Sequence, residues 1–404
     1  MLWQVTRRLA LTLAFIATFG LLIWVFYLRE LRPNQRGVHL LLDDGRNSWD
    51  SALWAEHLQY ARQWVGDGGY VVELIRADDL NIEKWQYFLD LCDSLSVTPV
   101  LRLATTYDHS RRWWNAPTAD ADGSYRMISA QFAAFIAGLE WPASEHYVIV
   151  GNEPNHGDEW GGRPDPAAYA RYLMDVAAAL HALDPQIRVL NAGLDPYAPN
   201  TGSIPFDNSM YYLDEESFLD GMFLAYPDVF SSIDVWASHS YPQGPFTQPP
   251  WVQTYGRDML NGAVNLRHQE PPAGIFNRGV NGYEWELWKL ADFGVEELPV
   301  MITETGWRHA ESIVPHTLDN APQPLPDVDT VRQYLDMAFY GNDGRYQQYP
   351  TTGWTPWAND ARLIGVVLFA LDGVPAEWGH SNWLTLDADG HVLDTYAMFD
   401  LLGR

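Results

Sequence analysis

The chain has 404 residues and a formal net charge of -27. A hydrophobic content of 47% is enough for a large core and excludes a disordered protein. Because a phosphate backbone must be met by clustered Lys and Arg, and no basic run occurs in the body of the chain, the charge also argues against nucleic-acid binding. The sole cysteine, Cys92, excludes an intrachain disulfide and a thiolate metal cluster.

The first predicted element is a membrane span. Residues 9–28, LALTLAFIATFGLLIWVFYL, carry no charge. At about 1.5 Å per residue such a helix covers a hydrocarbon core of roughly 30 Å, so we expect a transmembrane anchor after a tail of residues 1–8. A cleaved signal peptide is the alternative, although no A-x-A cleavage site follows. The acidic body is most simply placed outside the cytoplasm, at the cell surface or in the periplasm, or secreted if the segment is cleaved. Charges on both flanks weaken the argument for this orientation: Arg7, Arg8, Arg29, Arg32 and Arg36.

After a linker, residues 29–36, eight apolar runs alternate with segments of helical spacing through a domain of residues 37–404. The apolar runs are residues 38–42, 71–75, 99–103, 147–150, 187–191, 233–237, 298–302 and 363–371. The clearest helical segments are residues 54–64, 81–95, 130–141, 165–183 and 331–340. Eight β-α units predict an α/β fold of the (β/α)8 TIM-barrel type. A doubly wound open sheet is the competing interpretation, but no Gly-rich phosphate loop follows the first strand.

The segments between these elements are long and rich in Pro, Gly, Asn, Asp and aromatic residues. We expect residues 108–128, 197–230, 240–282 and 308–328 to be loops at the catalytic face of the barrel. Near the end of the chain, the pattern predicts a turn at Asp389-Gly390 followed by a closing helix.

Two carboxylates follow predicted strands at the edge where parallel sheets display their chemistry. In VIVGNEPNHGDEW, Glu153 comes just after the fourth strand, and in ELPVMITETGWRH, Glu304 comes at the end of the seventh. Two carboxyls in unlike environments can divide glycoside cleavage between a protonated acid and an ionised nucleophile. Glu153 as a helix cap and Glu304 as an ordinary rim carboxylate are the alternatives.

At these residues the sequence resembles the glycoside hydrolases of clan A, which are TIM barrels with Asn-Glu on strand four and Glu on strand seven. The resemblance covers nearly the whole chain after the anchor. It implies that Glu153 is the acid/base, that Glu304 is the nucleophile of a retaining mechanism, and that no cofactor is needed. It also implies that Asn152 contacts the sugar 2-hydroxyl.

Three further positions match the clan. In DVWASHSYP, His239 and Tyr241 alternate onto one face of the sixth strand and are expected to point into the site. Arg76, after the second strand, matches the clan's arginine beside the nucleophile, whose charge would lower the pKa of Glu304. The alternatives are a core role for His239, a turn role for Tyr241, and a surface pairing of Arg76 with nearby aspartates.

Loop aromatics are candidates for stacking on sugar, because the 19 tryptophans offer flat apolar rings with a polar edge. The eighth strand departs from the commonest clan pattern: VLFALDG places Ala370 and Asp372 where many members carry a Trp, and Trp378 is expected to take over from the loop. The candidate platforms are Trp113, Trp114, Trp160, Trp307, Trp378 and Trp383.

The sequence therefore predicts a retaining glycosidase that acts on a poly- or oligosaccharide outside the cytoplasm, with its carboxyl groups about 5 to 5.5 Å apart. A membrane-tethered barrel that binds polysaccharide without cleaving it is one rival. A metal-dependent hydrolase is another, although no H-x-H or H-E-x-x-H spacing supports a metal. Residues near strand ends that such a metal would use are His39, Asp43, Asp44 and His239.

Overall fold

The structure is a computed structural model that describes residues 34–396, apart from residues 47, 143–144, 206–209, 255–258, 261–262, 265–270, 296 and 312–323. Gln35–Arg404 forms one compact unit. The predicted anchor at residues 9–28 lies outside the described residues. None of the helices in the described ranges is both long and apolar enough to cross a bilayer.

Eight parallel strands form one sheet in the order β7-β6-β3-β2-β1-β12-β11-β8. Their bounds are β1 (Arg36–His39), β2 (Tyr70–Arg76), β3 (Thr98–Ala104), β6 (His146–Val150), β7 (Ile187–Leu190), β8 (Trp236–Ser238), β11 (Val300–Thr305) and β12 (Leu363–Leu368). The two outer strands meet, because a parallel bridge joins Leu190 to Val235 and the Asp234 N–H donates to the Val189 carbonyl at 2.9 Å. The sheet is therefore a closed barrel, which confirms the TIM-barrel prediction against the open sheet.

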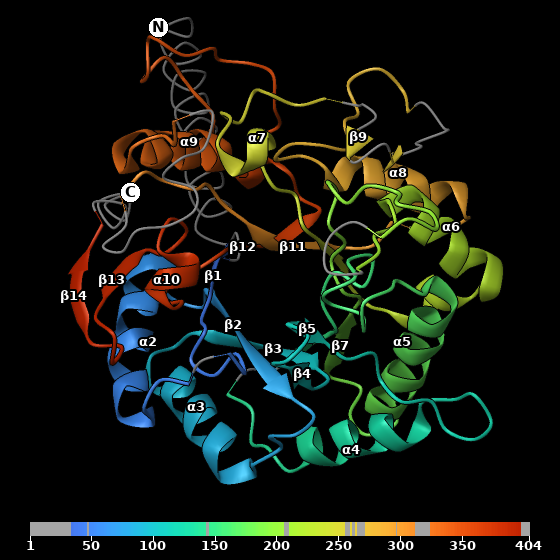
Figure 1. The fold of residues 1–404 in the computed structure, drawn as a ribbon. Coiled ribbons are helices and arrows are strands. Elements are labelled where there is room, and N and C mark those ends of the chain that lie inside the picture. Colours follow the sequence, from blue (N-terminus) through green and yellow to red (C-terminus); the bar gives the residue numbers. More distant parts are fainter. Residues whose placement is uncertain are drawn as a thin grey trace, which may run out of the picture. The chain divides into compact units, whose positions relative to one another are not determined.

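Helices follow the strands and pack around them, and Figure 1 shows α2, α3, α4 and α5 succeeding one another along the outside of the sheet. The seven longer helices are α2 (Ser51–Val65), α3 (Ile82–Ser94), α4 (Arg126–Ala137), α5 (Pro166–His181), α6 (Glu215–Ala225), α8 (Tyr283–Asp292) and α9 (Val328–Tyr340). Five of these begin after an Asp or Asn whose side chain accepts a hydrogen bond from a backbone N–H of the first turn, which stabilises the helix start. These capping residues are Asp50, Asn81, Asp165, Asp214 and Asp327.

Alternate residues of the strands fill the inside of the barrel. A small cluster, which includes Tyr70, Tyr147 and Met301, is enclosed by the strands, while a larger cluster lies between the strands and the helices. Gly365 leaves room for this interior packing, because a Cβ there would lie 3.2 Å from both Tyr70 and Met301. The barrel is thus a packed core, and its chemistry must sit at one end.

Short elements occupy the connections. The hairpins are β4 (Tyr107–Asp108) with β5 (Trp113–Trp114), β9 (Met259–Leu260) with β10 (Ala263–Val264), and β13 (Leu384–Leu386) with β14 (Val392–Thr395). Single turns of helix occur at η1 (Val229–Ser232), α7 (Gln243–Phe246), η3 (Trp357–Asn359) and α10 (Pro375–Trp378). The predicted turn at Asp389-Gly390 is present, and β14 follows it by pairing with β13. Residues 397–404, which hold most of the predicted closing helix, lie outside the described residues.

Candidate active site

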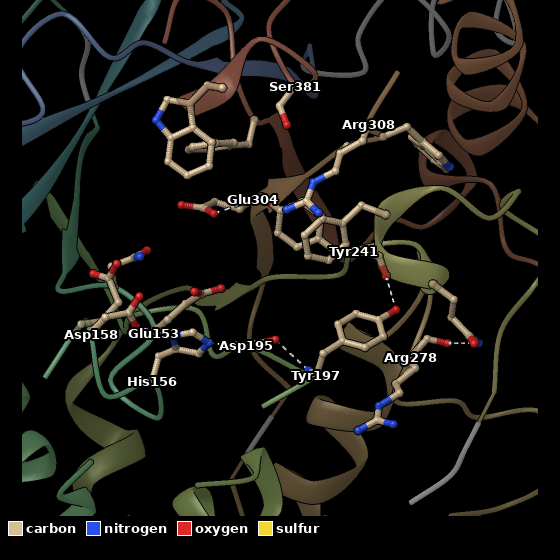
Figure 2. A pocket seen from close by; sticks show the side chains of 18 of the residues that line it. Glu153, His156, Asp158, Asp195, Tyr197, Tyr241, Arg278, Glu304, Arg308 and Ser381 are labelled. Carbon is tan, nitrogen blue, oxygen red and sulfur yellow. Dashed lines mark hydrogen bonds and ion pairs between the residues drawn. The ribbon is translucent and has the colours of Figure 1, made fainter. Parts of the chain in front are cut away.

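A cavity of about 870 Å³ opens at the carboxyl ends of the barrel strands. Its walls come from the loops after most of the strands, and Figure 2 shows side chains converging on it from several of them. Glu153 and Glu304 both line it, as do Asn152 and Tyr241. This is where ligands bind in barrels of this kind.

Glu153 is positioned by the backbone of two neighbouring loops. Its N–H donates to the Gly193 carbonyl at 3.0 Å, and it holds a left-handed φ of 32°, which is uncommon for a residue with a side chain. Its Oε1 lies 2.7 Å from Nδ1 of His239. Gly193 makes this contact possible, because a Cβ there would lie 2.1 Å from the His239 ring.

Glu304 is held at the end of β11 by three groups. Nη1 of Arg102 donates to its Oε1 at 2.7 Å, and the Tyr241 hydroxyl donates to its Oε2 at 3.1 Å. Nε2 of His39 lies 3.7 Å from Oε1 and donates to the Thr303 carbonyl at 2.8 Å. Burial lowers the pKa of His39 to about 3, so its ring is neutral at pH 7, whereas the guanidinium of Arg102 beside Glu304 is positively charged.

The two carboxyls sit in opposite electrostatic environments. Burial raises the pKa of Glu153, and the hydrogen bond from His239 offsets this only in part. Burial also acts to raise the pKa of Glu304, but His239, Arg102 and the Tyr241 hydroxyl outweigh it and bring that pKa below its ordinary value. The pKa of Glu153 is therefore shifted toward the protonated form and that of Glu304 toward the ionised form, which is the direction that an acid and a nucleophile require.

His239 and Tyr241 lie where the alternation places them, and both contact the carboxyl pair. Burial acts to lower the pKa of His239, but Glu304 and Glu153 raise it above the ordinary value. Tyr241 is buried, and its ring stacks on Phe246 at 4.2 Å. Asn152 accepts a hydrogen bond from Nη1 of Arg102 at 2.8 Å, so one guanidinium joins Asn152 to Glu304.

The expected placement of Arg76 beside Glu304 is corrected by the structure. Arg76 faces Asp43, Asp78 and Asp79 at 3.6 to 3.9 Å and does not line the cavity. The strand register explains why Arg102 occupies the place expected of Arg76. Leu74 of β2 pairs with Arg102 of β3, whereas Arg76 pairs with Ala104, two residues closer to the loops. Arg102 thus stands at the depth of the carboxyl pair, and Arg76 stands on the rim.

Three of the six candidate tryptophans line the cavity, and the other three pack elsewhere. Trp114, Trp307 and Trp378 line the cavity, and Phe369 of the eighth-strand segment lines it beside Trp378, with ring centroids 4.8 Å apart. The other three candidates do not line it. Trp113 packs against Gly162, Trp160 lies against Tyr169 and Tyr172, and Trp383 stacks on Trp64.

Sequence reasoning missed a polar wall that follows the fourth and fifth strands. His156 contacts Asp158 through Nδ1 and lies 3.1 Å from Asp195 through Nε2. These two carboxylates raise the pKa of His156 well above its ordinary value in spite of burial. Burial and the charge of Asp158 raise the pKa of Glu159 to about 8. The density of polar residues in NHGDE, directly after Glu153, was the available signal.

Arginines are the second group that was missed. Four of them line the cavity, and Arg46 is paired there with Asp44 at 3.3 Å and lies 5.4 Å from the Trp378 ring. Of the four, only Arg102 lies within a predicted strand, where period-two alternation places it on the face of Val100. The four are Arg46, Arg102, Arg278 and Arg308.

Among the described residues, one group of three offers ligand atoms close enough for a metal: Glu153, His239 and Glu304. Arg102 already donates to Glu304 there, and His239 contacts Glu153, so these atoms have partners without an ion. The residues named for a metal-dependent hydrolase are engaged elsewhere: His39 with the Thr303 carbonyl, Asp43 with Lys84, and Asp44 with Arg46.

Comparison with known proteins adds to the description of the fold. No protein-family model matches the chain, and no curated protein is significantly similar to it in sequence. A glucosidase from Croceicoccus marinus superposes with a TM-score of 0.53 at 12% identity, over 92% of this chain and 67% of that chain. A psychrophilic β-glucosidase from Micrococcus antarcticus superposes with a TM-score of 0.50 at 14% identity, over 92% of this chain and 96% of that one. The chain therefore shares the (β/α)8-barrel fold on which these two glucosidases are built.

Proposed function

We propose that this chain is a retaining glycoside hydrolase that acts on a poly- or oligosaccharide. The observation that carries the proposal is the carboxyl pair: one oxygen of Glu153 and one of Glu304 lie within 4.8 Å of each other, in environments that favour opposite protonation states. Retaining enzymes hold their carboxyls about 5–5.5 Å apart, whereas inverting enzymes leave about 6.5–9.5 Å for a water. That the two similar structures are named as glucosidases supports the same function.

The mechanism follows from the two environments. The ionised Glu304, oriented by Arg102 and Tyr241, attacks the anomeric carbon while Glu153 gives its proton to the leaving oxygen, and the glycosidic bond breaks. Glu153 then takes a proton from a water that attacks the same carbon, and the ester to Glu304 breaks. Both carboxyls return to their starting states.

We also propose that residues 9–28 anchor the enzyme in a membrane with the barrel outside the cytoplasm. The support is the uncharged apolar sequence of this segment, which is long enough to span a bilayer. Anchoring would place the enzyme beside a cell-surface or exported polysaccharide. Retention of the full chain in membranes washed with alkaline carbonate, together with its digestion by protease added to intact cells, tests both statements. Release by the wash would refute the anchor.

The first prediction concerns the covalent intermediate. Activated 2-fluoro glycosides stall a retaining enzyme after the first displacement, because the fluorine destabilises the positively charged transition state of the second. From a panel of such sugars, we expect at least one to add a single glycosyl mass to the protein, located on Glu304 by peptide mass spectrometry.

Matched variants sharpen this test. Glu304→Gln should abolish the adduct, while Glu153→Gln should still form it, since an activated leaving group needs no protonation. An adduct on another residue would refute the role of Glu304. Binding of oligosaccharides without any adduct or cleavage would favour the rival barrel that binds polysaccharide only.

A further inference from the structure

Arg308, which lines the cavity, has no counter-ion among the described residues. Arg308 follows β11 by three residues and lines the cavity. Its side chain makes no hydrogen bond or ion pair with any described residue, and its guanidinium carbon lies 4.8 Å from the centre of the Phe246 ring. By contrast, Arg46 is paired with Asp44 and Arg102 with Glu304. An unpaired charge away from bulk water is unfavourable, which suggests that a ligand supplies the partner.

Arg308 is also close to the reacting groups. Phe246, over which its guanidinium lies, stacks on Tyr241, and the Tyr241 hydroxyl donates to Glu304. Figure 2 shows the side chain of Arg308 extending past Tyr241 toward the side of the cavity where Glu304 lies. A group that contacts Arg308 would therefore belong to the sugar at Glu304 or to its neighbour.

The acidic residues of the cavity do not supply the missing charge. Asp158 and Asp195 flank His156, and Glu304 is paired with Arg102. Glu153 and Glu159 both have a raised pKa, because both are buried. None of the acidic residues that line the cavity forms an ion pair with Arg308 in the described part of the chain, although the formal net charge of the chain is -27. Burial lowers the pKa of Arg308 itself, which is the effect expected of a cation without a counter-ion.

We propose that the substrate carries a negatively charged sugar, a carboxylate or a sulfate ester, and that Arg308 binds this group beside Glu304. This rests on the proposed function and names its substrate class. The planar guanidinium presents a fork of donors that matches the oxygens of either group, and such charge-assisted bonds are stronger than bonds to a neutral hydroxyl. Neutral glycosides would leave Arg308 without a partner and would bind more weakly.

The competing interpretation is that Arg308 only packs on Phe246. The chain offers a matched control for it, because the guanidinium of Arg163 lies 4.7 Å from the Tyr211 ring while Arg163 is outside the cavity lining. Both arginines are stacked on an aromatic ring, but only Arg308 faces the cavity. Replacing each by Met removes the charge and keeps much of the apolar stem.

The experiment measures binding to the full-length Glu153→Gln variant, purified in mild detergent. This substitution stops turnover because it removes the proposed acid, and every comparison is made in the same Glu153→Gln background. The ligands are oligosaccharides of hexuronic acids, each paired with its carboxyl-reduced neutral counterpart, and sulfated oligosaccharides, each paired with its desulfated counterpart. Titration calorimetry gives Kd for each, with and without Arg308→Met or Arg163→Met.

We expect at least one acidic ligand to bind about tenfold or more tightly than its neutral counterpart, and Arg308→Met, but not Arg163→Met, to remove that difference. If the hexuronic-acid pair shows the difference in Kd, the group bound is a carboxylate, and if the sulfated pair shows it, the group is a sulfate ester. Equal binding of acidic and neutral members, no binding by any acidic ligand, or an unchanged preference in Arg308→Met overturns the proposal. Cleavage assays on the unsubstituted chain separate the two proposals. Cleavage of neutral and acidic sugars alike would support the hydrolase and refute the acidic substrate. Arg308-dependent binding of acidic sugars without any cleavage would support the acidic ligand and refute the hydrolase.

Discussion

At the scale of the residue, Arg102 places a positive charge in direct contact with the proposed nucleophile. It donates to Glu304 at 2.7 Å, and its positive charge favours the ionised carboxylate. In Arg102→Gln we expect the pKa of Glu304 to rise, so that activity is lost at a higher pH as the solution is acidified. An opposite charge at this range is worth about 1–3 pKa units, and the acid limb of kcat/KM should shift upward by that order.

Arg76→Gln is the control for this prediction. Arg76 also carries a guanidinium at the end of a neighbouring strand, but it faces three aspartates outside the cavity. The acid limb of kcat/KM in Arg76→Gln should lie at the same pH as in the unsubstituted chain. Equal shifts of the acid limb in both variants would show that long-range charge sets the pKa of Glu304, and that the contact with Arg102 does not.

These two arginines also show what the sequence could and could not predict. Glu153, Glu304, His239 and Tyr241 were predictable, because each follows or alternates along a recognisable strand. Choosing between Arg76 and Arg102 requires the stagger of β2 against β3, which sets the depth of each side chain in the barrel. Stagger depends on pairing between strands, and no single strand encodes it.

At the scale of the element, one tyrosine joins the ends of two strands to a helix. The Tyr169 hydroxyl, on α5, donates to the Val150 carbonyl at 3.1 Å and accepts from the Ala192 N–H at 2.6 Å. Val150 is the last residue of β6, three before Glu153. Tyr169→Phe leaves both backbone groups without this partner, and we expect the free energy of unfolding to fall by about 1–3 kcal/mol in chemical denaturation.

Tyr172, one turn along the same helix, is the matched control. It is as buried as Tyr169, but its hydroxyl has no hydrogen-bond partner among the described residues. Tyr172→Phe should therefore leave stability unchanged or raise it slightly. A loss as large as that of Tyr169→Phe would show that removing a buried hydroxyl from this helix is costly even without hydrogen bonds, so that the two bonds of Tyr169 do not carry the effect.

The strands and helices were predictable where the hydrophobic periodicity of the segment itself specifies them. All eight barrel strands and the five helices with clear periodicity are present in the structure. Two helices, α6 and α8, fell in or beside segments assigned to loops, and both bury charged residues: Glu215 and Glu216 on α6, and Glu286 and Lys289 on α8. Tertiary packing, which local pattern does not report, makes them helical.

At the scale of the whole molecule, buried titratable groups predict a stability that declines in alkaline solution. Burial and the charge of Asp372 raise the pKa of Glu73 well above its ordinary value, and Glu286 behaves likewise through burial and Glu215. A carboxyl that stays protonated when folded binds more protons than when unfolded. Its contribution is complete below the unfolded pKa and is lost as the pH rises toward the folded pKa.

Two buried histidines make stability decline in acidic solution instead. The pKa of His39 is about 3 and that of His309 about 4, so their contribution is present above the unfolded value of about 6.5 and is lost as the pH falls. Above pH 6.5 the carboxyls alone set the trend among these four groups. We expect the free energy of unfolding, and with it Tm, to fall as the pH rises above 6.5, and Glu73→Gln to flatten the slope of the free energy by at most about 1.4 kcal/mol per pH unit.

Glu83→Gln separates this effect from the repulsion of a chain with a net charge of -27. It also removes one carboxyl, but from the exposed start of α3, where the group is in contact with solvent. The slope of Tm against pH should persist in Glu83→Gln and flatten only in Glu73→Gln. A slope that flattens equally in both would assign the decline to net charge.

The distance along the chain between β6 and β11 has a consequence for biosynthesis. Glu153 leaves the ribosome roughly 150 residues before Glu304, which at about 5–20 residues per second amounts to roughly 8–30 s. During that interval the nascent chain already carries Glu153 and Arg102, His239 is added in its second half, and Glu304 is still missing. The pair comes together only when β11 takes its place between β8 and β12, so the site is completed by the same late step that closes the barrel.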